Sequence, residues 1–303
     1  MGKFINPFSD WGFKLIFGQE VNKDLLIQFL NDLLEGERHI CDIRFLDREQ
    51  LPETKDGREI IYDVFCITEM GEEFIVEMQN RYQEHFIDRS LYYASRAITG
   101  QGLKGSWNYR LYPVYTVCFM NFHVLDHTPQ KFRTDVALMD MQDHTLFSRN
   151  LRLIYLMLPL FPKHTEEACE TNFERWIYVL NNMQILERMP FMAQNAVFRK
   201  LAEITDISTL SREERSKYDE SLRILRDNLA AYESAISEGM EKGMKKGLQQ
   251  GREEGLEQGR EEGLEQGREE ERTSNARAMK REGISAETIS RITGLPLQVV
   301  EQL

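Results

Sequence analysis

Runs of apolar residues are densest between residues 58 and 79. Two β-forming segments, Glu59–Ile67 and Glu73–Gln79, flank a Glu69-Met70-Gly71-Glu72 turn, which predicts an antiparallel hairpin. In both segments the two faces are mainly apolar, a pattern typical of strands that are covered on both sides. The hairpin is therefore expected inside a sheet and not at its surface.

Three polar residues interrupt this apolar hairpin: Asp63, Glu77 and Gln79. Because side chains alternate along a strand, Asp63 should share a face with Phe65, and Glu77 should share one with Gln79. Buried acids are rare unless they are paired, protonated or bound to metal. Taken alone, Asp63 fits a bulge or an ion pair. If the hairpin sets Asp63 beside Glu77, however, their oxygens form a site for a hard divalent cation.

The remaining pattern alternates helices and strands. A helix is expected over Trp11–Phe17, after Ser9 or Asp10 as N-cap, and a second over Lys23–Leu34. The further predicted elements are the strand Cys41–Leu51, the helix His85–Gly100, the strands Tyr112–Phe122, Thr134–Met141 and Leu151–Leu160, and the helices Glu166–Met183, Pro190–Ile204 and Arg212–Tyr232. This order indicates an α/β fold with a mixed sheet flanked by helices.

The helix His85–Gly100 carries Arg89, Tyr93 and Arg96 on one face. One interpretation is that Arg89 reaches the acidic site or a phosphate. The other is that Arg89 is a surface residue whose stem packs on Tyr93. The sequence supports both interpretations equally.

A glycine recurs at every fourth position from Gly239 to Gly267. Each glycine inside a helix costs about 1 kcal/mol relative to alanine, so this stretch is marginal as an isolated helix. It is either a solvated linker or a helix whose glycine line admits a second helix at close range, which would make the protein a homo-oligomer. The following segment, 273–303, is expected to form a small helix-turn-helix-like unit with a marginal core.

Composition restricts the function classes. The formal net charge of −12 is unfavourable for DNA binding unless basic residues gather locally. The four cysteines lie far apart without a C-x-x-C pair, which favours reduced thiols in a cytoplasm. No apolar run is long enough to span a bilayer, so a protein without membrane contact is expected.

Several motifs together resemble the Rpn family of recombination-promoting nucleases, which belongs to the PD-(D/E)XK nuclease family transposases. The matching segments are Asp10-Trp11-Gly12-Phe13-Lys14, Phe29-Leu30-Asn31, Asp63, Val76-Glu77-Met78-Gln79 and Arg89-Ser90-Leu91-Tyr92-Tyr93. The resemblance covers about residues 5–180. One departure is that Gln79 stands where most members of the superfamily carry lysine.

The resemblance implies a restriction-endonuclease-like core that hydrolyses DNA phosphodiester bonds with Mg²⁺, or with Mn²⁺. Asp63, Glu77 and the backbone carbonyl of Met78 would hold the metal, and Gln79 would position water but supply no charge. Lys14 is the first candidate for the missing cation. Further supporting residues would be Asp10, Arg89 and Tyr93.

The alternative to an endonuclease linked to recombination or mobile elements is a non-cleaving DNA-binding or oligomeric scaffold protein that keeps the fold. The expected organisation is a nuclease-like core (1–165), a helical extension (166–235), the glycine-repeat tail (236–272) and the C-terminal segment (273–303).

Overall fold

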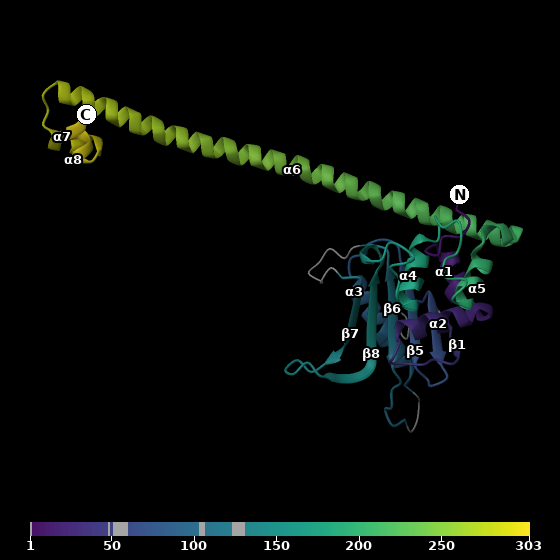
Figure 1. Cartoon of the computed structure of the whole chain (residues 1–303). Coiled ribbons are helices and arrows are strands. Elements are labelled where there is room, and N and C mark those ends of the chain that lie inside the picture. Colours follow the sequence, from purple (N-terminus) through teal and green to yellow (C-terminus); the bar gives the residue numbers. More distant parts are fainter. Residues whose placement is uncertain (1, 48, 51–59, 103–106, 123–130) are drawn as a thin grey trace. The chain divides into compact units, whose positions relative to one another are not determined.

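The computed structural model describes residues 2–47, 49–50, 60–102, 107–122 and 131–303. The chain divides into two units, Met1–Tyr232 and Glu233–Leu303. The first unit is built on a six-stranded mixed sheet with helices on both faces (Figure 1). This confirms the expected fold class.

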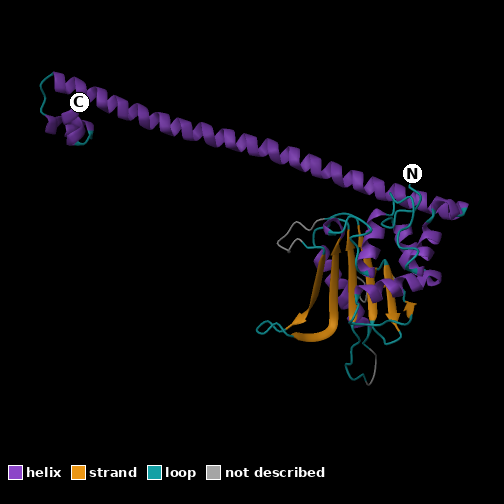
Figure 2. Cartoon of the chain, in the orientation of Figure 1, coloured by secondary structure: helices purple, strands orange, loops and turns teal. Residues whose placement is uncertain are grey.

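The sheet has the strand order β1-β4-β5-β6-β8-β7. Its strands are β1 (Ile43–Phe45), β4 (Val64–Thr68), β5 (Glu73–Gln79), β6 (Val114–Met120), β7 (Arg133–Met139) and β8 (Leu146–Met157). The central β5 pairs antiparallel with β4 and parallel with β6. A separate two-stranded sheet joins β2 (Glu49–Gln50) to β3 (Ile60–Ile61). Figure 2 shows the strands of the large sheet in orange with helices beside them.

The predicted hairpin is confirmed as β4 and β5, and Gly71 makes its turn possible. Gly71 adopts a φ of 85°, in the left-handed region that only glycine enters without strain. The Thr68 N–H donates to the Glu72 carbonyl, and the Gly71 N–H donates to the Thr68 carbonyl. The register sets Val64 opposite Val76.

Glu59, the first residue of the predicted strand Glu59–Ile67, lies outside the described residues. From Ile60 onward the prediction of one continuous strand is wrong, because the chain bends at Tyr62 and Asp63 between β3 and β4. The bend also shifts the alternation of faces. Tyr62 packs in the same apolar cluster as Phe65, whereas Val64 packs in the cluster on the other face. The described part of the predicted strand Cys41–Leu51, which lacks Arg48 and Leu51, is likewise divided between β1 and β2.

Two apolar cores cover the two faces of the sheet. The larger one gathers α1 (Asp10–Phe17), α2 (Lys23–Leu33), α4 (Asn172–Asn182) and α5 (Ala196–Thr205) over Phe74, Val76 and Phe119. The smaller one packs α3 (Phe86–Gly100) against Ile75, Cys118 and Tyr155. β5 is thus covered on both sides, as its sequence predicts.

The helix predicted over Arg212–Tyr232 starts at Arg212 as expected, but it continues to Arg281 as part of α6 (Arg212–Arg281). α4 and α5 start later than expected, at Asn172 and Ala196, and β8 starts earlier, at Leu146. Short 3₁₀ helices complete the unit: η1 (Glu20–Asn22), η2 (Leu158–Leu160) and η3 (Ile207–Thr209).

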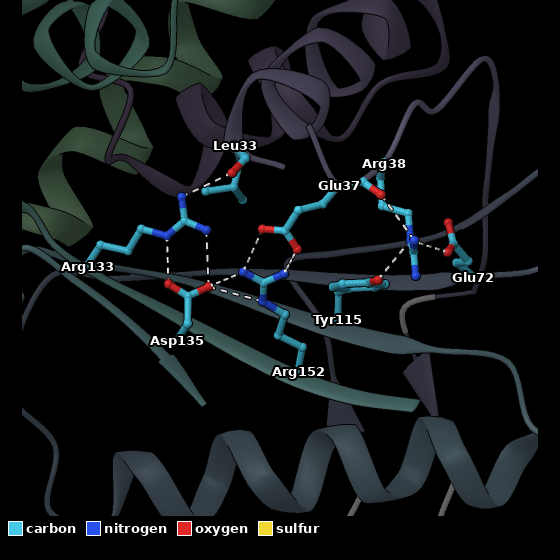
Figure 3. Close-up of polar contacts among 8 residues, drawn as sticks. All are labelled: Leu33, Glu37, Arg38, Glu72, Tyr115, Arg133, Asp135 and Arg152. Atoms are coloured by element: carbon cyan, nitrogen blue, oxygen red, sulfur yellow. Dashed lines mark hydrogen bonds and ion pairs between the residues drawn. The ribbon is translucent and has the colours of Figure 1, made fainter. Parts of the chain in front are cut away.

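A charged network ties the end of α2 to the β7–β8 pair on the sheet face that α2 covers (Figure 3). Asp135 accepts hydrogen bonds from Arg133 (Nε, 2.7 Å) and Arg152 (Nη2, 2.6 Å). Arg152 also pairs with Glu37, and the Arg133 guanidinium reaches the Leu33 carbonyl. The eight residues drawn come from six segments of the chain: α2, the loop after it, the turn before β5, and the strands β6, β7 and β8.

The helix α6 (Arg212–Arg281) starts in the first unit and contains the whole glycine repeat. Its first turns are anchored, because the Tyr218 hydroxyl accepts the Asn6 N–H and the Ser221 hydroxyl accepts the Trp11 N–H. In the second unit, the end of α6 packs with α7 (Ala286–Thr293) and α8 (Leu297–Gln302) around Ala276, Ile289, Leu295 and Val300. Among the described helices, none is apolar over enough length to cross a membrane.

Candidate active site

The hairpin sets Asp63 and Glu77 side by side through two reciprocal hydrogen bonds. The Asp63 N–H donates to Glu77 Oε1 at 3.2 Å, and the Met78 N–H donates to Asp63 Oδ2 at 2.8 Å. The Met78 N–H therefore donates to the Asp63 side chain and not to a backbone carbonyl of the neighbouring strand. For this reason regular strand pairing in β4 begins only at Val64. Each acid therefore uses one oxygen to fix its partner strand.

Glu77 is an acid in an apolar core. Its residue is only 3% exposed, and it lies beside Cys118 in the parallel register of β5 and β6, next to the cluster around Ile75 and Tyr155. Ionised carboxylates are costly in such surroundings unless they are paired. Among the described residues, the only cation that contacts Glu77 is Arg89, whose Nη2 lies 3.8 Å from Glu77 Oε2.

Arg89 comes from α3 and is held in place by its neighbours. Its guanidinium lies over the rings of Phe86 (5.1 Å) and Tyr93 (5.5 Å), and Nη1 donates to Gln83 Oε1 at 2.7 Å. Its Nε is buried and has no hydrogen-bond partner in the described part of the chain. Both interpretations of Arg89 thus describe it: it packs on Tyr93 and it reaches Glu77.

Burial and mutual repulsion both disfavour ionisation of the pair. Burial raises the pKa of Glu77, and the neighbouring Asp63 charge raises it further. Burial also raises the pKa of Asp63, although the Met78 N–H and the charge of Lys14 act in the opposite direction. Two adjacent acids with raised pKa values are a common feature of functional sites.

The N-terminal helix brings Asp10 and Lys14 to this site. Lys14 Nζ pairs with Asp10 at 2.6 Å, and the charges of both residues act on the pKa of Asp63. The helix is placed by Ser9, whose hydroxyl accepts the Gly12 N–H as N-cap. Gly12 itself has no room for a side chain, because a Cβ there would lie 2.2 Å from the Asn6 carbonyl oxygen.

Asn80 fastens this helix to the end of β5. Its side-chain amide donates to the Phe8 carbonyl at 2.6 Å, so the strand that carries Glu77 and the segment that leads to Asp10 are directly joined. Sequence reasoning missed Asn80, Gln83 and Cys118. The position of Asn80 immediately after Glu77-Met78-Gln79 was a signal that could have found it.

Gln79 lies one pleat beyond Glu77 on the same strand and is half-buried. Its backbone carbonyl accepts the Asn121 N–H at 2.8 Å. Within the described residues its side-chain amide makes no hydrogen bond, so this amide is available to a water or a ligand.

The donor set fits a hard divalent cation. Asp63 Oδ1 accepts no hydrogen bond from a described residue, and Glu77 Oε2 has only the 3.8 Å contact with Arg89. A cation between these oxygens would favour the ionised form of both acids and would offset the Asp63 charge that raises the pKa of Glu77. The described residues contain no cluster of three or more His, Cys, Asp or Glu side chains able to hold a metal. Any remaining ligands would be backbone, water or phosphate oxygens, as Mg²⁺ usually has.

The mixed sheet, its flanking helices and the acidic pair next to its centre define a PD-(D/E)XK-like nuclease fold. A family model described as PD-(D/E)XK nuclease family transposase matches residues 7–235, so the chain belongs to that family. No curated protein and no solved structure gives a match. Membership supports a nuclease linked to transposition, with DNA as its substrate.

Proposed function

We propose that this protein is a divalent-metal-dependent DNA endonuclease whose active site is formed by Asp63 and Glu77. The observation that carries the proposal is the reciprocal pairing of two acids next to the sheet centre, each with one carboxylate oxygen left over. A merely structural pair would be neutralised by neighbouring cations, as Asp135 is.

Asp63, Glu77 and the Met78 carbonyl are the residues proposed to hold Mg²⁺. When bound there, the ion would supply Lewis-acid polarisation of the scissile phosphate and a water of lowered pKa. The protein keeps the two carboxylates in register by their hydrogen bonds to the Met78 and Asp63 N–H groups. This pre-organisation means that the acids need not move when substrate binds.

Positive charge around the site comes from two different elements. Lys14 on α1 and Arg89 on α3 both act on the Asp63 carboxylate, and both can contact phosphate oxygens. These two residues supply the local basic character that an overall charge of −12 does not. Gln79 donates its amide N–H groups or accepts with its oxygen, and it positions a water without taking its proton.

The proposal is tested by incubating supercoiled plasmid with purified protein in millimolar Mg²⁺ or Mn²⁺, and in excess EDTA. We expect nicked and linear products only with metal. The matched control is Glu77→Gln, purified in the same way, which preserves shape and removes the charge. A parental protein that binds DNA but leaves it intact with both metals would instead identify a non-cleaving DNA-binding scaffold.

We also propose that chains associate through the glycine repeat of α6. At every glycine from Gly239 to Gly267 an added Cβ would meet no atom within 4 Å, and Met240, Met244 and Leu248 are more than two-thirds exposed. Such a helix is penalised by about 1 kcal/mol per glycine when alone, and close helix packing would offset that penalty. Association of two nuclease units would allow both strands of a duplex to be cut.

Replacement of Gly251, Gly255, Gly259 and Gly263 by alanine distinguishes a repeat that mediates association from a repeat that is only a linker. If glycines allow close packing, the four-alanine variant should have a lower molar mass by light scattering, in spite of its higher helix propensity. A variant with unchanged mass and increased helical circular dichroism would contradict association through this face.

A further inference from the structure

The β7–β8 hairpin carries a set of exposed large apolar side chains that the proposed active site does not use. Phe147 is 80% exposed and Met141 is 89% exposed. The other members of this patch, all at least two-fifths exposed, are Val136, Leu138, Met139 and Leu146. A concentration of apolar surface of this kind marks an interaction site. In Figure 1 the hairpin extends beyond the other strands of the sheet.

The same hairpin contains an open sheet edge. β7 is the last strand of the sheet, and no described strand pairs with its outer side. The Met157 N–H donates to the Phe132 carbonyl, and the register continues with Thr134 opposite Tyr155. In an antiparallel ladder the alternate residues point their N–H and C=O groups away from the neighbouring strand. Here those residues are Arg133, Asp135 and Ala137.

An open edge of this kind is recognised by another extended strand, because only a strand satisfies a row of alternating donors and acceptors. The register of β7 shifts after Ala137, so the straight part of the edge is short. Main-chain pairing alone would be weak over this length, and the exposed apolar side chains beyond the shift supply the additional burial that it needs.

The charges along β7 select the partner strand. Lys131 lies exposed two residues before the strand and has no ion pair with a described residue, while Asp140 and Asp143 lie exposed after its last residue, Met139. A second copy of β7 in antiparallel orientation, with a two-fold axis at Val136, brings the Lys131 end of one copy to the end that carries Asp140 and Met141 in the other. The parallel orientation would place like charges together. The edge is therefore complementary to itself.

We propose that the β7 edge pairs with β7 of a second copy, which joins two six-stranded sheets into one continuous sheet. The interface is isologous, as in most homodimers, and it buries Val136 against Val136. It uses the first unit alone and does not depend on the proposed chemistry or on the glycine repeat. This interface goes beyond the proposed nuclease activity, because it would fix how two active sites are spaced.

The experiment measures the molar mass of the full-length protein by light scattering across tens of micromolar. Ala137→Pro removes an outward N–H at an edge, where proline is tolerated, and should lower the molar mass to that of chains joined by the glycine repeat alone. Lys131→Glu should weaken the dimer by about tenfold through like-charge repulsion with Asp140 and Asp143. Lys131→Glu combined with Met141→Lys restores opposite charges across the axis and should recover most of the mass.

Two controls make the result decisive. Ile185→Glu changes an equally exposed apolar residue outside the hairpin and should leave the mass unchanged. The four-alanine tail variant tests the other surface. If Ala137→Pro does not fold, the molar masses of Lys131→Glu and of Lys131→Glu combined with Met141→Lys still test the proposal. A monomeric parental protein, a mass that Lys131→Glu does not change, or a mass lost only in the tail variant would overturn the proposal.

Discussion

Two clusters of carboxylates and basic side chains lie on opposite faces of one sheet, and they shift the pKa values of their acids in opposite directions. In the charged network of Figure 3, Asp135 lies between Arg133 and Arg152. Burial alone would raise the pKa of Asp135, but the hydrogen bonds from these two arginines outweigh it and hold the pKa below its usual value. In the acidic pair, burial raises the pKa of both Asp63 and Glu77; the charge of Asp63 raises the pKa of Glu77 further, and the charge of Asp10 acts in the same direction on Asp63.

The difference lies in the number of cations for each acid. The network supplies two arginines for one aspartate and satisfies Glu37 as well, so it is a closed set of charges. The site supplies one arginine at 3.8 Å for a buried glutamate, and its lysine is shared with Asp10. Acids whose charges are balanced by neighbouring arginines stabilise the fold. Acids whose charges are not balanced can bind a further cation.

The largest expected effect is on catalysis. Glu77→Gln and Asp63→Asn each remove one charge from the pair, and we expect plasmid cleavage to fall by about 10³-fold or more. The free energy of unfolding should not decrease, because a buried like-charge repulsion is relieved. Asp135→Asn is the matched control of the same chemistry on the other face and should retain the parental rate. A Glu77→Gln protein that cleaves at the parental rate would show that the site lies elsewhere.

The second effect is on the free energy of unfolding, which should decrease in Asp135→Asn but not in Glu77→Gln. Asp135→Asn leaves Arg133 and Arg152 without their shared carboxylate, and it should cost about 1–3 kcal/mol of unfolding free energy. Partial exposure of this network keeps the loss below that of a fully buried pair. Urea denaturation measures the difference. A loss in Glu77→Gln equal to that in Asp135→Asn would mean that the two clusters are equivalent.

The sequence predicted the part of the site that depends on local pattern. Alternation and the Gly71 turn gave the β4–β5 hairpin, and period two placed Glu77 and Gln79 on one face, as observed. The bend at Asp63 was not predicted, because a period-two pattern assumes that backbone groups satisfy each other. Here the Asp63 side chain accepts the Met78 N–H instead, and this substitution depends on three-dimensional register.

Other errors have equally local causes. β8 begins earlier than predicted because its first half is exposed and includes Ser148, Arg149 and Asn150, which do not form an apolar run. The start of α4 was readable, since Thr171 and Glu174 form a capping box. The charged network was not readable at all, because Glu37, Asp135 and Arg152 are far apart in the sequence and each is an ordinary surface residue type.

The third effect concerns Gln79, the residue that distinguishes this site from the lysine-bearing form of the motif. Gln79→Ala removes an unengaged amide and should lower cleavage by about tenfold, through loss of one positioned water. Gln79→Lys should retain activity, because an ammonium at this place adds the charge that the site lacks. A folded but inactive Gln79→Lys protein would indicate that Lys14 already fills that role, and Lys14→Met should then be inactive on its own.

The smallest effect is a difference in how the two clusters respond to pH. Asp135 has a lowered pKa, so its contribution to stability is present above its unfolded value and is lost as the pH falls towards its folded value. Asp63 and Glu77 have raised pKa values, so they cost no stability at low pH and become destabilising as the pH rises above their unfolded values. Asp135→Asn should therefore destabilise the protein equally at pH 5 and pH 8, whereas Glu77→Gln should be more favourable at pH 8 than at pH 5. Glu73, whose pKa burial raises to about 7, titrates in the same range. The measurement is therefore the difference in the free energy of unfolding between variant and parent, in metal-free buffer at pH 5 and at pH 8. A Glu77→Gln difference that is larger at pH 5 than at pH 8 would contradict the raised pKa of the acidic pair and, with it, the contrast between the two faces.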